Sequence, residues 1–359
     1  MIVRPLTEYC TLNMGQSPDS KTYNTQGNGL PFYQGNADFG ETHPITRVWC
    51  SAPVKTAENG DILISVRAPI GAMNTAVERC CIGRGLAALT PIRNKCSKQF
   101  LYYALQSKVD SLIAQGTGST FKAISKKVLE ATYIPAYSSD EQEHISNTIG
   151  RVDRAVAARR NQLILLDQLV KSRFVELFGV YPLNPKGWET ATIRDIVTDV
   201  RYGSSRPAVD GGKYPYLRMN NITYGGELDL TDTKRIDIPD NELDKCTVRR
   251  GDVLFNRTNS KELVGKTCVY NRDEMMVLAG FVIRVRVTER ILPEFLSAFL
   301  NTDFSKRMLL GMCKAAIGQA NINAQEMQDI GIYLPPTELQ RQFVQFKEQT
   351  DKSKYYSIT

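Results

Sequence analysis

Histidine is scarce in this chain, and its scarcity narrows the chemistry that the chain can perform. Only two histidines, His43 and His144, occur among 359 residues, and they lie in different segments. Neither has a companion at the spacing of a metal site or a catalytic triad, so we interpret both as solvated or packed side chains. The eight cysteines include no CxxC pair, which predicts reduced, mostly buried thiols and no zinc site.

Long apolar runs are also missing. No stretch approaches the ~20 consecutive apolar residues that a membrane-spanning helix needs, and the first residues lack the apolar segment of a signal peptide. Both absences predict a cytoplasmic protein without a membrane partner. The net charge of +7 is compatible with nucleic-acid binding but does not require it.

Motifs that would make the chain an enzyme are absent as well. Residues 116–122 lack the GxxxxGK[ST] spacing of a phosphate-binding loop. Asp240 lies too close to Asp244 and Lys245 to form a PD-(D/E)xK nuclease site, which draws on two adjacent strands. Neither an adenine-methyltransferase NPPY motif nor a GxGxxG motif after a strand occurs. We therefore predict no catalytic residue and no cofactor in this chain.

What the sequence does contain is an internal repeat with a period of roughly 190–200 residues. Four landmarks recur in the same order, and each suggests the same local structure in both copies. They are an opening segment that ends in a glycine turn (6–15 and 193–203), a strand with a polar loop (31–40 and 215–226), a Gly-Asp turn into a buried strand (60–71 and 251–265), and a block that leads through a short strand to a helix start (116–142 and 316–340).

One long helix is predicted between the two copies, over residues 139–178. This stretch contains no proline and a single glycine, Gly150. Its apolar residues recur at alternating steps of four and three, which is typical of a coiled-coil seam and predicts a spacer of ~60 Å with a partner helix rather than a core helix. Ser139 with Gln142, and Thr337 with Gln340, fit capping boxes that would start this helix and a second, shorter copy. The seam consists of Ile145, Ile149, Val152, Val156, Leu163, Leu166, Val170 and Leu177, with Arg159 and Arg173 at the two remaining positions.

The predicted fold is therefore α+β, with two tandem α/β-mixed domains separated by long coiled-coil helices and related by a pseudo-two-fold axis. Short β-rich runs bounded by Gly, Pro and Asn support the mixed character of each domain. We place the first domain at residues 1–138, the long spacer helix at 139–179, the second domain at 180–336 and the short second helix at 337–359.

Loops rich in hydrogen-bond donors are the candidate DNA-binding elements. Arginine can read guanine and Asn or Gln can read adenine, whereas lysine mostly contacts phosphates. Two recurrences support the set: Arg67 and Arg257 follow a Gly-Asp strand start by six or seven residues, and Gln34 and Arg218 follow a proline and an aromatic or apolar residue. For any one residue, a solvated surface side chain is the competing interpretation. The candidates are Gln34, Asn36, Arg67, Arg84, Lys122 and Lys126 in the first copy, and Arg218, Asn220, Asn221, Arg257, Asn259, Lys266 and Gln319 in the second.

Taken together, these segments resemble a known family. GDILISVRAPIGAMN, GRGLAAL, GSTFKAISKKVLEATYIPAYSSDEQEHI and a heptad helix ending in RFVELFG are similar to the type I restriction-modification specificity subunit. GDVLFNRT and GQANINAQEMQDIGIYLPPTELQ repeat the pattern, so the resemblance covers essentially the whole chain. Two departures are that the chain starts directly in the first domain and that its second helix is short.

The resemblance implies a function without catalysis in this chain. Each domain would be a target-recognition domain that reads one half of a bipartite, gapped site in double-stranded DNA. The helices would pack together and dock two methyltransferase subunits that carry S-adenosylmethionine and modify adenine, with a motor-nuclease subunit as a further partner. Two alternatives stay open: a fused restriction or modification enzyme subunit, and a two-lobed scaffold without the salt-dependent duplex affinity of a DNA reader.

Overall fold

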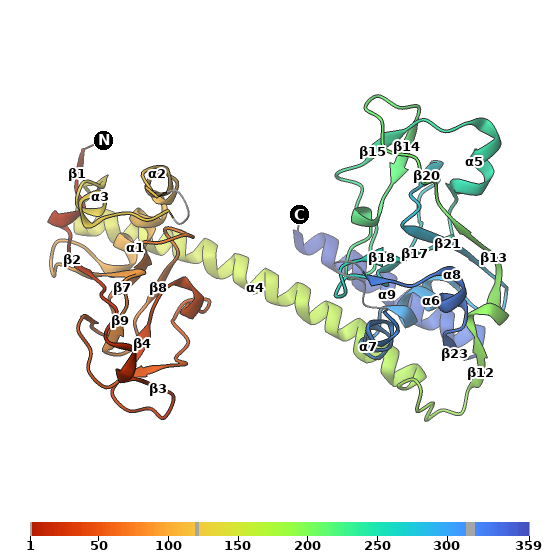
Figure 1. Ribbon diagram of the computed structural model, residues 1–359, viewed down its shortest axis with the longest axis horizontal. Coiled ribbons are helices and arrows are strands. Elements are labelled where there is room, and N and C mark those ends of the chain that lie inside the picture. The colour runs from red at the N-terminus through yellow and green to blue at the C-terminus, as the bar shows by residue number, and fades with distance from the viewer. Residues whose placement is uncertain (1, 119–121, 314–319, 359) are drawn as a thin grey trace. The chain divides into compact units, whose positions relative to one another are not determined.

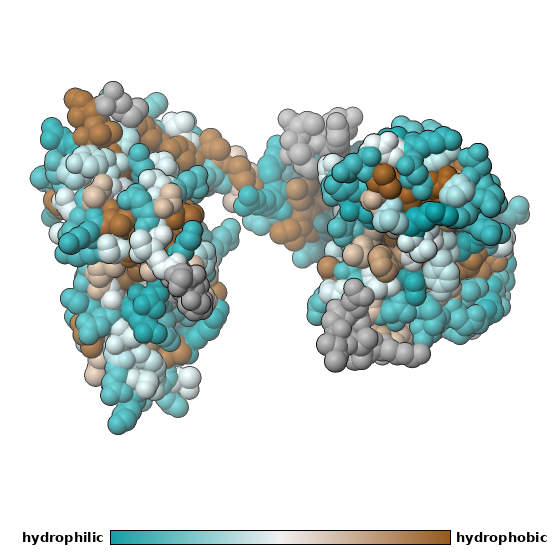
Figure 2. Space-filling view, turned by 45° about the horizontal axis from the view of Figure 1, so that its top comes forward, coloured by the Kyte–Doolittle hydropathy of each residue, from teal (hydrophilic) through white to brown (hydrophobic). Residues whose placement is uncertain are grey.

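The computed structural model describes residues 2–118, 122–313 and 320–358, which fold into two compact units (Figure 1). The units are Met1–Ala157 and Ala158–Thr359, and the boundary falls inside the long helix α4 (Ser139–Phe178). On the face drawn in Figure 2, hydrophilic residues predominate over the second unit and apolar residues gather in small groups. Within the described ranges, no helix combines the length and apolar character needed to cross a membrane.

The first unit contains two sheets and a separate two-strand pair. Its central antiparallel sheet has the order β2-β10-β7-β8, and its second sheet has the order β3-β5-β4-β9-β6. The strands are β1 (Val3–Pro5), β2 (Cys10–Met14), β3 (Tyr23–Asn24), β4 (Leu30–Tyr33), β5 (Trp49–Cys50), β6 (Thr56–Ala57), β7 (Ile62–Ser65), β8 (Met73–Thr75), β9 (Cys80–Ile82), β10 (Leu86–Pro91) and β11 (Tyr133–Pro135), and the helices are α1 (Lys98–Gln106), α2 (Val109–Ala114) and α3 (Lys126–Glu130).

Strand β7 shows why the Gly-Asp run of the first copy is so apolar. Ile62 and Ile64 pack into a core that includes Phe100 of α1. Leu63 points to the opposite face and packs with Tyr33 in a second core. Side chains alternate between the faces of a strand, so a strand covered on both faces must be apolar throughout. The prediction of a buried strand after Gly60 is therefore confirmed.

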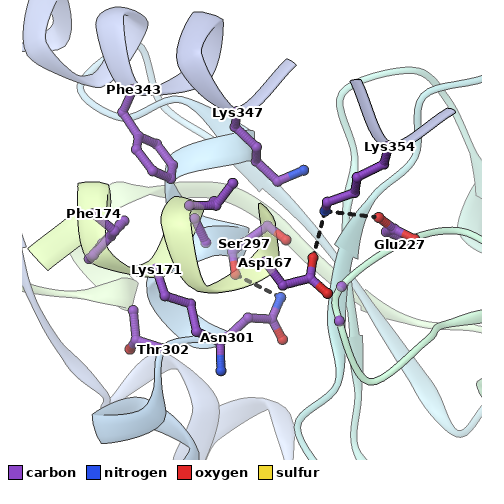
Figure 3. Close-up of a pocket in the computed structure, with 14 residues that line it drawn as sticks. Asp167, Lys171, Phe174, Glu227, Ser297, Asn301, Thr302, Phe343, Lys347 and Lys354 are labelled. Atoms are coloured by element: carbon purple, nitrogen blue, oxygen red, sulfur yellow. Dashed lines mark hydrogen bonds and ion pairs between the residues drawn. The ribbon is translucent and has the colours of Figure 1, made fainter. Parts of the chain in front are cut away.

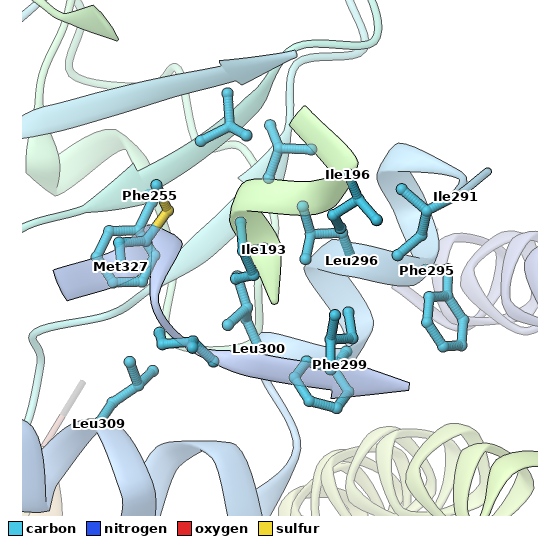
Figure 4. Packing of buried hydrophobic residues seen from close by; sticks show 14 of the residues in the cluster. Ile193, Ile196, Phe255, Ile291, Phe295, Leu296, Phe299, Leu300, Leu309 and Met327 are labelled. Carbon is cyan, nitrogen blue, oxygen red and sulfur yellow. The ribbon is translucent and has the colours of Figure 1, made fainter. Parts of the chain in front are cut away.

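The second unit repeats this plan with a larger core. Its central sheet has the order β13-β21-β17-β19, beside a sheet of order β15-β14-β20-β16. Figure 4 shows Ile193, Phe255 and Phe299 meeting in the core that the helices cover. The strands are β12 (Glu189–Thr192), β13 (Val197–Tyr202), β14 (Tyr214–Leu217), β15 (Lys234–Ile236), β16 (Thr247–Val248), β17 (Val253–Asn256), β18 (Thr258–Asn259), β19 (Thr267–Val269), β20 (Met276–Leu278), β21 (Val282–Val287), β22 (Ala320–Asn321) and β23 (Gly331–Leu334), and the helices are α5 (Asp240–Cys246), α6 (Pro293–Leu300), α7 (Asp303–Met312), α8 (Ala324–Gln328) and α9 (Thr337–Ile358).

The internal repeat predicted from the sequence is confirmed by the sheets of the two units. The central sheets have matching orders, and each second sheet contains one parallel pair, β4 with β9 and β14 with β20. Gly15 and Gly203 occupy equivalent turns, because Gly15 N donates to Leu86 O at 2.9 Å and Gly203 N donates to Val282 O, the counterpart of Leu86 O, at 3.3 Å. The chain thus consists of two tandem α+β domains with a helix between them.

Helix α4 has the bounds that its heptads predict, and its second half pairs with α9. Phe174 and Phe178 place their ring centroids 5.2 and 5.7 Å from that of Phe343. Further along α9, Lys354 Nζ lies 2.6 Å from Asp167 Oδ1, so the two helices run antiparallel. By contrast, three earlier seam residues, Ile149, Val152 and Val156, are 36%, 58% and 43% exposed.

A pocket of about 190 Å³ lies between α4, α6 and α9 and is lined by Val170, Phe174 and Phe343 (Figure 3). Its charged rim is paired internally, because Lys354 also lies 2.9 Å from Asp351 and 3.9 Å from Glu227. Burial alone would lower the pKa of Lys354, but the hydrogen bonds that its ammonium donates to Asp167 and Asp351 raise it. We interpret the rim as a clamp that holds α9 on α4.

Both predicted capping boxes are wrong, and the reason is the same in each copy. At the start of α4, the cap is formed by Ser138, whose backbone N and Oγ both lie 2.8 Å from Glu141 Oε2. Gln142 is buried instead, and its Oε1 accepts from Ser97 N at 3.1 Å. Gln340 is fully buried, and its Oε1 accepts from Leu292 N at 2.8 Å. Each glutamine thus joins the turn before a distant helix to the segment that precedes its own helix, because its Nε2 also donates to Tyr137 O or to Pro335 O.

Candidate nucleic-acid interface

Gln34 and Arg218 occupy equivalent positions at the ends of the parallel strands. Residue Tyr33 of β4 pairs with Ile82, and Leu217 of β14 pairs with Leu278. Each strand then enters a short 3-10 turn. The backbone N of Gln34 donates to Asp38 Oδ2 at 2.7 Å, and that of Arg218 donates to Asn221 Oδ1 at 2.8 Å. The equivalence suggested by the sequence therefore holds in the fold.

Arg67 and Arg257, by contrast, are not equivalent. Residue Ser65 pairs with Leu86 in the first unit, and Asn256 pairs with Val282 in the second. Continuing each strand by one residue makes Val66 the counterpart of Arg257, and by two residues makes Arg67 the counterpart of Thr258. The isolated pairing of Arg67 with Ala123 and of Thr258 with Asn321 supports this register. The predicted pairing was wrong by one residue, which in a strand turns the side chain to the other face.

In the first unit, the candidates gather where β4, β7 and the β9–β10 turn end. The backbone N of Val66 donates to Gly85 O at 2.9 Å, and that of Ala68 donates to Lys122 O at 3.0 Å. These bonds hold the segments that carry Arg67, Arg84 and Lys122 next to one another at the ends of the strands, and all three residues are exposed. Gly85 approaches Gln34 so closely that a Cβ would lie 2.3 Å from Gln34 O.

The two outer candidates of this unit differ from the group. Asn36 is half-buried in the 3-10 turn after β4. Lys126 lies on α3, where its Nζ is 3.3 Å from Glu130 Oε1, and both side chains are largely exposed. An exposed ion pair of this kind contributes little to stability, so Lys126 stays available to an anionic partner.

In the second unit, a pocket of about 480 Å³ brings three candidates together: Arg218, Asn220 and Arg257. The guanidinium of Arg257 lies 4.8 Å from the ring centroid of Tyr202, while Arg218 Nη2 lies 2.9 Å from Asp232 Oδ2. The Nε atoms of both arginines are buried, and neither has a hydrogen-bond partner in the described part of the chain. The pocket is completed by Ser204, Ser205, Arg206, Pro207, Ala208, Tyr216, Met219, Ala279, Gly280 and Phe281.

Three further candidates support the fold from inside. Asn221 is buried, and its Nδ2 donates to Asp229 O at 2.8 Å. Lys266 is also buried, its Nζ donates to Met219 O at 2.9 Å, and burial lowers its pKa. Asn259 donates to Asn256 Oδ1 at 2.9 Å and accepts from Ser260 N. Gln319 lies outside the described residues.

Two residues of the pocket were missed by the sequence analysis, Arg206 and Phe281. Arg206 Nη2 lies 2.6 Å from Glu242 Oε1, and this bond raises the pKa of the arginine. Phe281 is 51% exposed, which is unusual for a large apolar side chain beside three arginines. Arg206 follows the Gly203 turn directly, so the first landmark of the repeat could have drawn attention to it.

The candidate site is a group of hydrogen-bond donors. It offers guanidinium and amide donors beside aromatic rings, which suits hydrogen bonding to base edges and phosphates. Over the part of the chain that the structure describes, no cluster of three or more His, Cys, Asp or Glu side chains is arranged to hold a metal ion.

Comparison with known proteins identifies the family to which the chain belongs. Residues 1–166 and 185–355 each match the type I restriction modification DNA specificity domain, so the chain belongs to this family. A protein of Methanocaldococcus jannaschii named as the type I restriction enzyme MjaX specificity subunit is 39% identical over 43% of this chain and 36% of its own length. The type I restriction enzyme EcoKI specificity subunit of Escherichia coli is 24% identical over 70% of this chain and 56% of its own length. This chain thus spans only about a third to a little over half of these relatives.

The fold is similar to that of a solved structure over nearly the whole chain. A crystal structure of a type I restriction-modification S subunit from M. genitalium matches 99% of this chain and 90% of its own, with a TM-score of 0.59 and 16% identity. The HsdS subunit from Thermoanaerobacter tengcongensis is 48% identical over 44% of this chain and 38% of its own, with a TM-score of 0.40. The first match covers both domains and the helix between them, and it supports the tandem fold.

Proposed function

We propose that the chain is a non-catalytic DNA specificity subunit in which each domain reads one half of a bipartite, gapped site in double-stranded DNA. The observation that carries the proposal is the second-domain pocket, where Arg218, Asn220 and Arg257 converge beside the exposed ring of Phe281. Arginine and asparagine are suited to reading guanine and adenine edges in the major groove. Membership of the DNA specificity family supports the same function.

The first domain reads its half-site with a matching set. Gln34 stands at the position of Arg218, and Arg84 projects from the turn beside it. Arg67 and Lys122 are exposed on adjoining segments and contact phosphates in this proposal. Phosphate contacts set register and supply salt-dependent affinity, whereas base contacts supply the sequence preference.

The remaining segments carry the assembly. Residues 1–138 and 180–336 are the recognition domains in this proposal, and residues 139–179 and 337–359 are helices that pair about a pseudo-two-fold axis and dock two methyltransferase subunits. Those subunits bring S-adenosylmethionine and modify adenine, and a motor-nuclease subunit is a further partner. The protein acts in the cytoplasm and has DNA and protein partners but no membrane partner. The antiparallel contact of α9 with α4 supports the helix pairing.

A methylome tests this function directly. The chain is co-expressed with the methyltransferase encoded beside it, in a host that lacks other adenine methylation, and the genome is sequenced for modified adenines. We expect a bipartite motif with a fixed gap that disappears when this chain is omitted. A stable complex that binds duplex DNA without modifying it contradicts the partner assignment, and a chain with no salt-dependent duplex affinity contradicts DNA reading and favours the scaffold alternative.

A further inference from the structure

The two domains carry an arginine at different members of one pair of equivalent positions. The strand registers make Val66 the counterpart of Arg257, and they make Arg84 the counterpart of Gly280. Equivalent backbone bonds confirm both assignments: Val66 N donates to Gly85 O at 2.9 Å, and Arg257 N donates to Phe281 O at 3.0 Å. Where the first domain has valine and arginine, the second has arginine and glycine.

The side chain of Arg257 extends toward Gly280, which is the counterpart of Arg84 in the first domain. Arg257 Nη1 donates to the carbonyl oxygen of Gly280 at 3.4 Å, so the end of its side chain lies beside that residue. In the first domain the equivalent residue is Arg84, whose own backbone N donates to Ser17 Oγ at 3.3 Å. Ser17 follows the Gly15 turn just as Ser205, which lines the second-domain pocket, follows the Gly203 turn. The backbone of Arg84 therefore occupies, in the first domain, the corner at which the side chain of Arg257 ends in the second.

The surroundings of Arg257 hold its guanidinium in one orientation and leave most of its N–H donors without a strong hydrogen bond among the described residues. Tyr202 stacks against the guanidinium, and the Tyr202 hydroxyl accepts a hydrogen bond from Ala324 N at 2.8 Å, which holds the ring in place. The Nε atom is buried without a partner among the described residues, and the bond to Gly280 O is long. A planar fork held in one orientation is what bidentate recognition requires, whereas a phosphate contact tolerates any mobile cation.

We propose that Arg84 and Arg257 are functional counterparts, each of which reads a guanine at the corresponding position of its own half-site. In this proposal the two domains bring an arginine to one corner of the recognition surface from different connecting segments, and Arg67, despite its similar place in the sequence, is not part of this pair. The inference rests on the proposed function and deepens it, because it names the residues and the base that they recognise.

The test uses the full chain in complex with its methyltransferase, and it measures relative affinity for duplexes randomised at each position of the site. Arg257→Val copies the first domain and should reduce the preference for one guanine of the second half-site by roughly 5- to 150-fold. Arg84→Ala should do the same at one guanine of the first half-site. Arg257→Lys keeps the charge but lacks the fork, so it should lose the preference as well. Arg272→Ala, an exposed arginine outside the pocket, is the matched control.

The decisive variant moves the arginine from the segment between β17 and β18 to the turn between β20 and β21. Arg257→Val combined with Gly280→Arg recreates the arrangement of the first domain and should restore the guanine preference at the same position. A Cβ on Gly280 would lie 3.2 Å from the backbone oxygen of Ser204, so this variant requires the Ser204 backbone to shift by a few tenths of an ångström. Melting curves and complex formation identify any variant that fails to fold, and Arg257→Lys remains the milder alternative for that case.

Each outcome separates this inference from the function on which it rests. A wild-type complex without any site preference contradicts the proposed function itself. A wild-type motif with no G·C pair in one half-site overturns the inference for that domain. A uniform loss of affinity at every position in Arg257→Val, with full affinity in Arg257→Lys and a salt slope reduced by about one, assigns Arg257 to a phosphate and overturns guanine reading.

Discussion

Replacing Gln340 with leucine should destabilise the second unit, because three hydrogen bonds converge on this one buried side chain. Its Oε1 accepts from Leu292 N at 2.8 Å, and its Nε2 donates to Arg290 O at 3.2 Å and to Pro335 O at 2.8 Å. At a net ~0.5–1.5 kcal/mol for each bond, the loss amounts to about 1.5–4.5 kcal/mol. The high end applies if the freed groups stay buried without water.

The two tryptophans make the assay specific to one unit. Trp49 lies in the first unit and Trp188 in the second, so a Trp49→Phe background reports urea unfolding of the second unit by fluorescence. Gln345→Leu, at an exposed position of α9, is the matched control. A midpoint for Gln340→Leu equal to that of Gln345→Leu would refute the reasoning, because the buried bonds would then contribute nothing. Gln142→Leu, followed through Trp49 in a Trp188→Phe background, should repeat the effect in the first unit.

Three further predictions follow from the packing and from the titrating groups. Phe343→Ala should lower the free energy of unfolding by about 3–5 kcal/mol, measured by urea denaturation, because its fully buried ring fills the contact of α9 with α4. Burial lowers the pKa of Lys306 to about 8. Between pH 8 and the ordinary value of 10.5 the unfolded chain therefore holds a proton that the folded chain lacks, so stability should rise with pH by about 3 kcal/mol at most, a rise that Lys306→Met should abolish in denaturation at pH 8 and pH 10. Seven of the eight free cysteines are buried, and burial raises the pKa of Cys268 and others to about 12, so an aromatic disulfide reagent should modify only the half-buried Cys313 in the native protein; rapid reaction of further thiols would contradict this packing.

The long helix and the repeat could be predicted from the sequence because their signals are local or self-similar. The heptads of α4 predict its bounds, because the stretch contains no proline and a single glycine, so no residue within it ends the helix. The role of Gln142 could not be predicted in this way, because two of its partners, Lys95 and Ser97, lie more than forty residues away. A Ser-x-x-Gln spacing favours a capping box only when the glutamine has no better bonds to make elsewhere.

The candidate site was predictable by residue type but not by orientation. Arg218, Asn220 and Arg257 do meet in one pocket, yet Asn221 and Lys266 turn inward and bond backbone carbonyls. Donor-rich loops need their own internal hydrogen bonds, since a buried carbonyl without a partner costs more than a solvated side chain gains. Composition cannot separate the two uses, because the same amide or ammonium group satisfies either.

The two copies of the domain differ most where a side chain faces outward and least where it bonds the backbone. Gln142 and Gln340 make the same kinds of bond: the side-chain oxygen accepts from a backbone N–H, and the side-chain nitrogen donates to backbone carbonyls. Because these backbone groups have fixed positions, only one orientation of the side-chain amide satisfies them. The arginine of the recognition corner is under no such constraint. A long side chain can reach one region from either of two neighbouring segments, and the side chain of Arg257 ends beside Gly280, the counterpart of Arg84, so the two arginines can serve one purpose from different positions in the proposal. Base-reading arginines of two such domains should therefore be matched by where their guanidinium groups lie in space, and not by their positions in the sequence repeat.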